Sequence, residues 1–347
     1  MPPQPHILIV GNFLSAKGGS RGVCEELAIR LPERGWPVIT TSSRSNRFLR
    51  LFDMLWTAWR ARKQYDVAQI DVFSGPSFLW AEAVCWILRR LKKPYVLTLH
   101  GGNLPGFARR WQRRVNRLLR SAARVTTPSV YIKTSFSKIR DDILLLPNGV
   151  DLSSYSFQHR LQPAPRLTWL RAFHAIYNPI MAAKALSFLV SEFPDIHLTM
   201  FGPDKKDGSL NAMQKWAQEA GIAPRIHTPG SIPKAKIPSE LASYDIFLNT
   251  TTAESFGVSV VEAAALGMCI VTTNVGELPY IWTDDHDALL VPPDDPQAMA
   301  SAVRRILNEP GLAGYLSHNA RKTAEQFDWS IVLPQWERLL LEAQARN

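Results

Sequence analysis

Glu254 and Glu262 are separated by seven residues in a segment whose pattern predicts strand, loop, helix and strand. An apolar run over 246–249 precedes Glu254, which then lies in the loop at a strand's carboxyl end. The next helix begins around residues 256–258, and its first N–H groups have no partner within the helix, so they can receive a phosphate or sugar oxygen. Glu262 lies two turns further on, where it could accept two hydrogen bonds from a vicinal diol such as a ribose. A helix-terminal charge and a solvated surface residue are the alternative interpretation of such a pair.

This pattern resembles the hallmark of the family 4 glycosyltransferases, in which two glutamates have the same spacing across a strand, a loop and a helix. The likeness extends over nearly the whole chain, through the segments 148–151 (NGVD), 200–203 (MFGP), 275–279 (VGELP), 289–292 (LLVP) and 327–330 (FDWS). The resemblance implies a retaining transfer of a sugar from a nucleotide diphosphate sugar, with no metal or other cofactor. It also implies a GT-B architecture, in which two Rossmann-like domains face a cleft.

The resemblance assigns roles to individual residues. Glu254 would lie by the donor sugar and Glu262 would bind the ribose hydroxyls. His100, at a strand end, matches the acceptor-side histidine near the reacting carbon; a capping or core histidine is the alternative. The remaining expected donor contacts are the backbone amides of Phe256, Gly257 and Val258, the diphosphate-covering Gly18 and Gly19, the base contacts Ser231 and Ile232, and Asn148 at the hinge.

One cation that the family usually carries is absent. Members have a glycine–arginine pair and then a lysine about five residues on; here Arg171 matches the arginine, but the lysine position falls on 176–178, which reads Ile-Tyr-Asn. Arg171 and helix amides must then stabilise more of the charge on the leaving diphosphate, so we expect Arg171 to act in catalysis with Glu254 and His100. Lys205 or Lys206 could supply the missing charge, although a solvated loop pair is the alternative.

The elements that position these residues follow from twelve β-rich segments that alternate with helix-length segments. The segments are 6–11, 37–41, 67–72, 95–100, 125–127, 143–146, 167–171, 196–201, 225–228, 246–249, 270–273 and 288–291. Strands separated by helices predict an α/β chain with doubly wound parallel sheets. We expect an acceptor-side domain over 1–155, a nucleotide-sugar domain over 156–326, and a helix over 327–347 that packs back on the first domain.

Charge is unevenly distributed along the 347 residues. The net charge is +10, but residues 1–150 carry 24 Lys and Arg against 9 Asp and Glu, and residues 151–347 carry 16 against 21. The basic half predicts an anionic partner. Basic clusters lie at 44–63, 89–93 and 109–120. The first contains Phe48, Phe52, Trp56 and Trp59, and in the third Arg110, Arg113, Arg114 and Arg117 are expected on one helix face.

A basic helix with aromatic residues is typical of a lipid headgroup layer, while a solvated face with buried aromatics is the alternative. We therefore expect an anionic membrane surface and a lipid-linked phosphorylated or oligosaccharide acceptor as partners. A nucleic-acid binder would use the same arginines but would leave Glu254 and Glu262 unexplained. The scattered histidines form no metal motif.

The apolar stretch 78–88 is too short to span a bilayer, no basic leader precedes the first strand, and three cysteines lie in apolar patterns. These features predict a cytoplasmic protein attached peripherally to the inner face of the membrane. The expected function is hexosyl transfer in cell-surface polysaccharide synthesis, with a uridine donor favoured. A catalytically weak sugar-nucleotide-binding subunit and a GT-B sugar-nucleotide epimerase are the alternatives.

Overall fold

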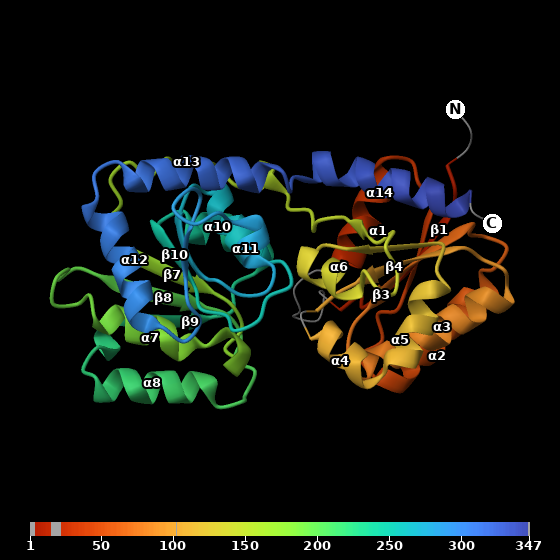
Figure 1. Ribbon diagram of the computed structural model, residues 1–347, viewed down its shortest axis with the longest axis horizontal. Helices are drawn as coiled ribbons and strands as arrows, with labels where there is room; N and C mark the ends of the chain where they lie inside the picture. The colour runs from red at the N-terminus through yellow and green to blue at the C-terminus, as the bar shows by residue number, and fades with distance from the viewer. Residues whose placement is uncertain (1–3, 15–21, 102, 346–347) are drawn as a thin grey trace. The chain divides into compact units, whose positions relative to one another are not determined.

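The computed structural model describes residues 4–14, 22–101 and 103–345, which form two units (Figure 1). Unit 1 comprises Met1–Gly149 and Ser330–Asn347, and unit 2 comprises Val150–Trp329. Each unit contains one six-stranded sheet in which all paired strands run parallel. The prediction of two doubly wound parallel sheets is confirmed, and each of the twelve expected segments contains a strand whose ends differ from the prediction by at most two residues.

The sheet of unit 1 has the order β2-β1-β3-β4-β5-β6. Its strands are β1 (Ile7–Val10), β2 (Val38–Thr41), β3 (Val67–Val72), β4 (Tyr95–Leu99), β5 (Arg124–Thr127) and β6 (Leu144–Leu145). The order reverses between β1 and β3. Ligands of open parallel sheets bind beyond the carboxyl ends of the strands at such a reversal. The residues that follow β1, β3 and β4 are therefore the candidate ligand contacts of this unit.

Helices cover both faces of this sheet. They are α1 (Val23–Glu33), α2 (Arg47–Arg60), α3 (Ser77–Arg90), α4 (Leu104–Arg110), α5 (Gln112–Arg120), α6 (Val130–Phe136) and α14 (Trp329–Gln344). Figure 1 shows α14 on one side of the sheet and α2 and α3 on the other. Alternate strand residues point to opposite faces, so Leu8 and Val10 pack with the α2–α6 side while Ile7 and Ile9 are buried on the other.

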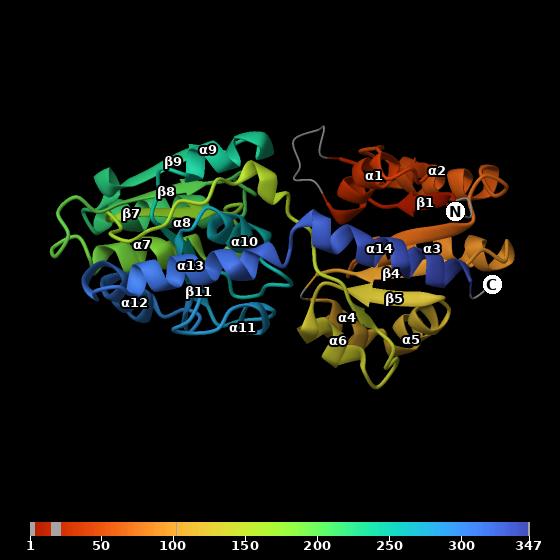
Figure 2. The ribbon, with the colours of Figure 1, turned by 90° about the horizontal axis from the view of Figure 1, so that it is seen from above.

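The C-terminal helix α14 belongs to unit 1 although almost 180 residues of unit 2 separate it from the rest of that unit. Trp36 Nε1 donates to Glu337 Oε1 at 3.0 Å, and Arg124 Nη2 donates to Glu342 Oε2 at 3.0 Å. Trp336 is buried on the same helix. Figure 2 shows α14 running over the sheet of unit 1.

Unit 2 repeats the architecture with the order β12-β11-β10-β7-β8-β9. Its strands are β7 (Arg166–Leu170), β8 (His197–Phe201), β9 (Ile226–Gly230), β10 (Ile246–Asn249), β11 (Cys269–Thr273) and β12 (Leu289–Val291). Its helices are α7 (Pro179–Ser187), α8 (Ser209–Glu219), α9 (Ile237–Leu241), α10 (Val258–Ala265), α11 (Leu278–Ile281), α12 (Pro296–Asn308) and α13 (Leu312–Glu325). Figure 1 shows α7 and α8 on one side of the sheet and α10 and α13 on the other. Here the order reverses between β10 and β7.

The prediction of one helix over residues 109–120 is wrong. Trp111 leaves the helical region, with φ −121° and ψ 39°, and separates α4 from α5. Arg110 therefore ends one helix while Arg113, Arg114 and Arg117 lie on the next. Arg114 is partly exposed, but it also forms an ion pair with Glu82 on α3 and packs over the ring of Trp111, 5.4 Å from the ring centroid.

Candidate functional site

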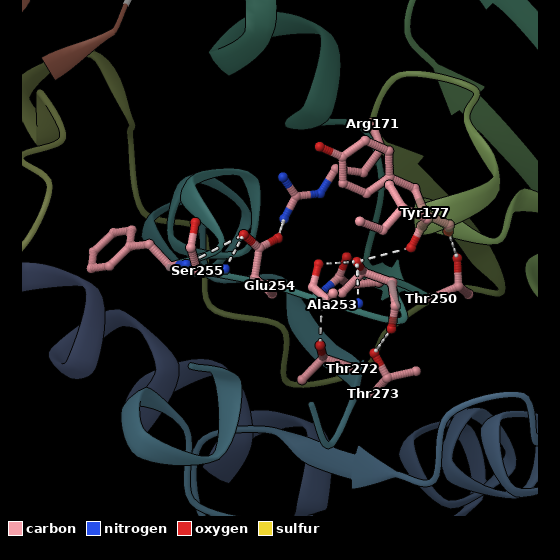
Figure 3. A network of polar contacts seen from close by, with 12 residues as sticks. Arg171, Tyr177, Thr250, Ala253, Glu254, Ser255, Thr272 and Thr273 are labelled. Atoms are coloured by element: carbon pink, nitrogen blue, oxygen red, sulfur yellow. Dashed lines mark hydrogen bonds and ion pairs between the residues drawn. The ribbon is translucent and has the colours of Figure 1, made fainter. Parts of the chain in front are cut away.

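In unit 2, the residues just beyond β7 and β10 bring together a cation and a carboxylate at the reversal of strand order. Arg171 follows β7, Glu254 lies in the loop after β10, and Arg171 Nη2 donates to Glu254 Oε2. Their side chains are 15% and 10% exposed. Figure 3 shows the Arg171 guanidinium pointing at the Glu254 carboxylate. Two of the three residues expected in catalysis are therefore direct partners.

The backbone around Glu254 holds its carboxylate in one orientation. Oε1 accepts from the N–H of Ser255 at 2.9 Å and of Phe256 at 3.3 Å. Gly257 adopts φ +89°, which a residue with a side chain rarely adopts, and α10 begins at the next residue. A side chain at Gly276 would lie 2.0 Å from the Glu254 carbonyl oxygen, so only glycine allows this close approach.

Buried threonines fix the loop that carries Glu254. Thr250 Oγ1 donates to Tyr177 O at 2.7 Å, Thr251 Oγ1 donates to Ala253 O at 2.8 Å, and Thr273 Oγ1 donates to Thr251 O at 2.6 Å (Figure 3). Thr250, Thr251 and Thr273 are fully buried. A loop with this many internal hydrogen bonds loses little conformational entropy when a ligand binds, so Glu254 and Arg171 are preorganised.

The segment that lacks the family's lysine contacts Arg171 with an aromatic ring. The Arg171 guanidinium carbon lies 5.2 Å from the ring centroid of Tyr177, which is the position after Ile176. Among the described residues, Arg171 Nε is buried without a hydrogen-bond partner. The N–H of Thr252 donates to Ile176 O at 2.8 Å, so this turn also anchors the Glu254 loop. The Arg171 guanidinium thus has N–H donors that its bond to Glu254 does not use.

Lys205 and Lys206 lie in the exposed loop after β8. The Lys205 N–H donates to Phe173 O at 3.1 Å, two residues beyond Arg171, and the Lys206 N–H donates to Asp204 Oδ1 at 2.8 Å. Their backbones are thus fixed next to the Arg171 segment, while their side chains make no ion pair with the described residues.

Glu262 is a buried residue of α10, 4% exposed, and not a solvated surface charge. Tyr155 donates its hydroxyl to Glu262 Oε1 at 2.9 Å. The expected base contacts are near the end of β9, where Ser231 is exposed and Ile232 is half-buried against the core of unit 2. Glu262 and Glu254 are carried by the same loop and helix, while Arg171 comes from the end of β7.

In unit 1, His100 follows β4 and forms a hydrogen bond with Asp71 of the neighbouring strand β3. His100 Nε2 lies 3.1 Å from Asp71 Oδ1, and the two side chains are 11% and 5% exposed. Gln69 Nε2 donates to the same Asp71 oxygen at 2.8 Å and to Thr98 Oγ1 at 2.8 Å. The Phe73 ring is stacked on the imidazole, with the centroids 5.0 Å apart. His100 is thus held from two sides, which the capping interpretation does not explain.

Asp71 is ionised in this environment. Burial favours the neutral acid, but His100, Gln69 and Cys24 together hold the pKa of the Asp71 carboxyl below its usual value. Burial, with Asp71 next to it, raises the pKa of the Cys24 thiol far above its usual value, so the thiol keeps its proton and donates. Asp71 can then only accept, and His100 Nε2 must carry a proton.

A small pocket opens at this edge of unit 1. Its lining includes Gly11 and Asn12 beyond β1, Asp71 and Phe73 of β3 and its end, and Ser77 at the start of α3. The expected contacts Gly18 and Gly19 lie outside the described residues. Asn148 is half-buried in the segment after β6, just before unit 1 passes into unit 2.

Sequence reasoning missed Asp71, Gln69, Tyr155, Tyr177 and the threonines after β10. A signal existed for the first two, because Gln69 and Asp71 alternate within the apolar strand 67–72 and so share one face. No group of three or more His, Cys, Asp or Glu side chains in residues 4–14, 22–101 and 103–345 is arranged to hold a metal ion. None of the described helices combines the length and the apolarity needed to cross a membrane.

Two family models match the two halves of the chain. The model described as Glycosyltransferase Family 4 matches residues 17–154, and the one described as Glycosyl transferases group 1 matches residues 167–323. A phosphatidyl-myo-inositol mannosyltransferase from Mycolicibacterium smegmatis is 26% identical over 297 residues, which cover 81% of this chain and 72% of the relative. A D-inositol 3-phosphate glycosyltransferase from Paenarthrobacter aurescens is 26% identical over 267 residues, with 73% and 65% covered.

Solved structures share the fold over the whole length. HepE from Anabaena, in complex with UDP, superposes with a TM-score of 0.77 at 18% identity and covers 96% of this chain and 99% of its own. Sucrose-phosphate synthase from Thermosynechococcus elongatus gives a TM-score of 0.78 at 17% identity, with 99% and 100% covered. Two Rossmann-like units with this topology define the GT-B class of enzyme. With both halves matched by models of one family, the chain belongs to the family 4 glycosyltransferases.

Proposed function

We propose that this glycosyltransferase moves a hexose from a uridine diphosphate sugar to a lipid-linked or polysaccharide acceptor, with retention at the sugar carbon, in cell-surface polysaccharide synthesis. The observation that supports it most is the Arg171–Glu254 pair at the reversal of strand order in unit 2. A guanidinium beside a helix N-terminus suits a diphosphate, and a carboxylate beside it suits sugar hydroxyls.

Each residue of unit 2 then has a distinct task. Glu262 accepts the ribose hydroxyls, held in place by Tyr155. The amides of Phe256, Gly257 and Val258 take sugar and phosphate oxygens, for which the Phe256 N–H exchanges its bond to Glu254 Oε1 for one to the ligand. Arg171 offsets the charge that develops on the diphosphate as the bond to the sugar breaks, because preorganised donors stabilise charge without reorganising. We propose that this occurs without a metal ion, so transfer should persist in excess EDTA. Lys205 or Lys206 supplies the second cation.

The support for a lipid-linked acceptor is the outer face of α2 in unit 1. Phe48, Phe52, Trp56 and Trp59 are 85%, 65%, 45% and 47% exposed, so the alternative in which these aromatics are buried is wrong. Phe52 stacks on Trp56 with the centroids 6.3 Å apart, and Trp56 lies 5.4 Å from Trp59. Aromatic rings on a basic helix insert into a headgroup layer. The phosphatidyl-myo-inositol mannosyltransferases are named for a lipid acceptor, which agrees with this proposal.

Donor and stereochemistry are tested together. The protein is screened for hydrolysis and transfer across uridine, guanosine and adenosine diphosphate sugars, and proton NMR of the first product reads the anomeric centre. We expect turnover with a uridine donor and the donor's own configuration in the product. An inverted centre would refute the retaining mechanism, and turnover only with another base would refute the donor assignment.

Peripheral membrane attachment is tested by flotation with vesicles that contain anionic lipid. Changing Phe52, Trp56 and Trp59 to Ser should release the protein while donor hydrolysis stays intact, and raising the salt concentration should weaken binding because surface attraction is screened over about 10 Å at 0.1 M. Changing Tyr280 and Tyr315 of unit 2, which are also exposed, to Ser is the matched control. Equal flotation with neutral and anionic vesicles, or none with either, would contradict the membrane proposal.

A catalytically weak sugar-nucleotide-binding subunit is the second candidate, and one observation favours it. Tyr177 and Ile176 occupy the segment where the family's lysine is expected, so Arg171 lacks the usual companion charge there. Calorimetric binding of UDP without turnover of any nucleotide sugar would support this candidate over the transferase.

A further inference from the structure

The contact between His100 and Asp71 is built by four segments that meet at the carboxyl edge of the unit 1 sheet. Asp71 Oδ1 receives His100 Nε2 and Gln69 Nε2, and the Cys24 thiol of α1 also donates to this carboxylate. Gly11, just beyond β1, comes so close that a side chain there would lie 2.5 Å from Cys24 Sγ and 3.2 Å from Asp71 Oδ2. The carboxylate is therefore almost completely buried and accepts from three donors.

This enclosure fixes the orientation of the His100 ring. An ionised Asp71 accepts but cannot donate, so the ring is held with a proton on Nε2 directed at the carboxylate. The Phe73 ring, tilted by 21° from the imidazole plane, covers one face of it. Turning the ring over would break the contact with Asp71, and Nδ1 forms no hydrogen bond with the described residues. Nδ1 is consequently the ring nitrogen that is left to interact with a ligand.

A buried carboxylate is a costly way to hold a core histidine. Removing a charge from water costs free energy, and a neutral side chain could pack against His100 equally well. Asp71 makes no ion pair with any other described side chain, and Asp71 and Phe73 also line the pocket beside Asn12 and Ser77. The groups that hold His100 thus form one wall of a cavity at the point where this fold binds ligands.

We propose that Asp71 is a positioning residue for glycosyl transfer, which fixes the ring orientation and the proton of His100 so that Nδ1 faces the substrate. This inference rests on the proposed function, in which His100 acts on the acceptor side of the reacting carbon. Asp71 itself does not contact the substrate's reacting atoms. Gln69 and the Cys24 thiol, the other donors to Asp71, keep the carboxylate from rotating away from the ring.

Asp71→Asn tests the proposal because the amide is isosteric but can donate to Nε2. We expect kcat for transfer to fall about 100-fold, as for a small misplacement of a catalytic group, while the calorimetric Kd for UDP changes less than twofold. Long-range ¹H–¹⁵N spectra should show the His100 proton moving from Nε2 to Nδ1. Unchanged kcat, or an unchanged tautomer, would overturn the proposal.

Controls separate positioning from folding. Asp53→Asn alters another partly buried carboxylate of unit 1, which accepts from Thr41 Oγ1 at 3.5 Å, and should leave kcat unchanged. Asp71→Glu, which restores the charge, should recover at least tenfold of the lost kcat; no recovery would contradict the proposal.

If Asp71→Asn does not fold, Gln69→Met removes one donor to Asp71, and an unchanged kcat there would also overturn the proposal. The tautomer measurement needs no substrate. It therefore tests Asp71 even where the wild-type protein turns over no nucleotide sugar, a result that would refute the proposed function instead.

Discussion

Unit 1 and unit 2 each place a basic side chain and a carboxylate at the carboxyl ends of their central strands, but the two pairs are constructed differently. In unit 1 the carboxylate, Asp71, is part of a strand and its partner is a histidine at a strand end. In unit 2 the carboxylate, Glu254, is in a loop and the cation is Arg171, which stays charged at every relevant pH.

The difference shows how one fold serves two chemical purposes. An arginine beside a loop carboxylate provides permanent charge that can be shared with a diphosphate. A histidine held by a strand carboxylate has a fixed ring orientation, with Nε2 directed at the carboxylate. The two halves of the chain also differ in net charge, which is +15 for residues 1–150 and −5 for residues 151–347. The basic half is thus the one whose candidate site contains a histidine and not an arginine.

Replacing Arg171 should have the largest effect on activity. We expect Arg171→Ala to lower kcat about 10²- to 10³-fold, because one preorganised donor to developing charge contributes about 2.7–4 kcal/mol. Steady-state donor hydrolysis measures it. Arg166→Ala is the matched control, since Arg166 begins the same strand and pairs with Asp245 at 2.7 Å, and it should cost less than threefold. If Arg171→Ala kept wild-type kcat, permanent charge in unit 2 would have to come from Lys205 or Lys206.

Glu262→Ala should weaken UDP binding next most strongly. Each hydrogen bond to a charged group contributes about 1.5–3 kcal/mol, so we expect Kd by calorimetry to rise roughly 10- to 150-fold. Tyr155→Phe should have a smaller effect, because it removes only the donor at 2.9 Å that orients Glu262. The exposed Glu240 provides a control as Glu240→Ala. Unchanged affinity for every nucleoside diphosphate would exclude Glu262 from the donor site.

Ile176→Lys should strengthen UDP binding by adding a permanent charge to unit 2. Ile176 is 38% exposed and lies where the family's lysine is expected. A partly exposed ion pair contributes about 0.2–1 kcal/mol, so UDP should bind about 1.5- to 5-fold more tightly. Phe188→Lys, at another exposed position of unit 2, should leave the affinity unchanged. Equal tightening by both variants would indicate net charge alone.

The smallest expected effect is on thermal stability, and it concerns two buried aspartates whose pKa values shift in opposite directions. Burial raises the pKa of Asp287 in unit 2, whereas the pKa of Asp71 is lowered. A raised folded-state pKa means that ionised Asp287 destabilises the fold above that pKa, and the penalty disappears as pH falls through it. Asp287→Asn should therefore raise Tm at pH 7 by about 1–2 °C.

Asp71→Asn should lower Tm at pH 7, because the stabilisation from a lowered pKa is present above the unfolded value and is lost as pH falls through the folded one. Thermal melts between pH 7 and pH 4 give both comparisons. If both variants changed Tm in the same direction at neutral pH, the two carboxylates would not be distinguished by their environments.

The strands and the donor motif were predictable because their signals are local. Short runs rich in β-branched and apolar residues mark the strands, and Glu254 and Glu262 lie within nine residues of each other. The pairing of Arg171 with Glu254 could be inferred only from the family resemblance, since 83 residues separate them. Strand order then brings the loops after β7 and β10 together.

Features that depend on tertiary packing were not predictable. Asp71 meets His100 only because β3 and β4 are neighbours, which a single sequence does not state. No proline or glycine marks the break at Trp111, and the spacing of the arginines continues through it. Packing decides that break, as the Trp111 ring lies 6.5 Å from Phe107 and under the Arg114 guanidinium.

The return of α14 to unit 1 determines the order in which the chain can fold during synthesis. Unit 2 is one continuous segment, so it can complete its core as soon as Trp329 has left the ribosome. Unit 1 must wait for Trp336, Leu339 and Leu340, which are buried in α14, and until then the surface they cover is exposed. A stop codon after Trp329 would therefore leave the later-synthesised unit intact and unfold the one made first.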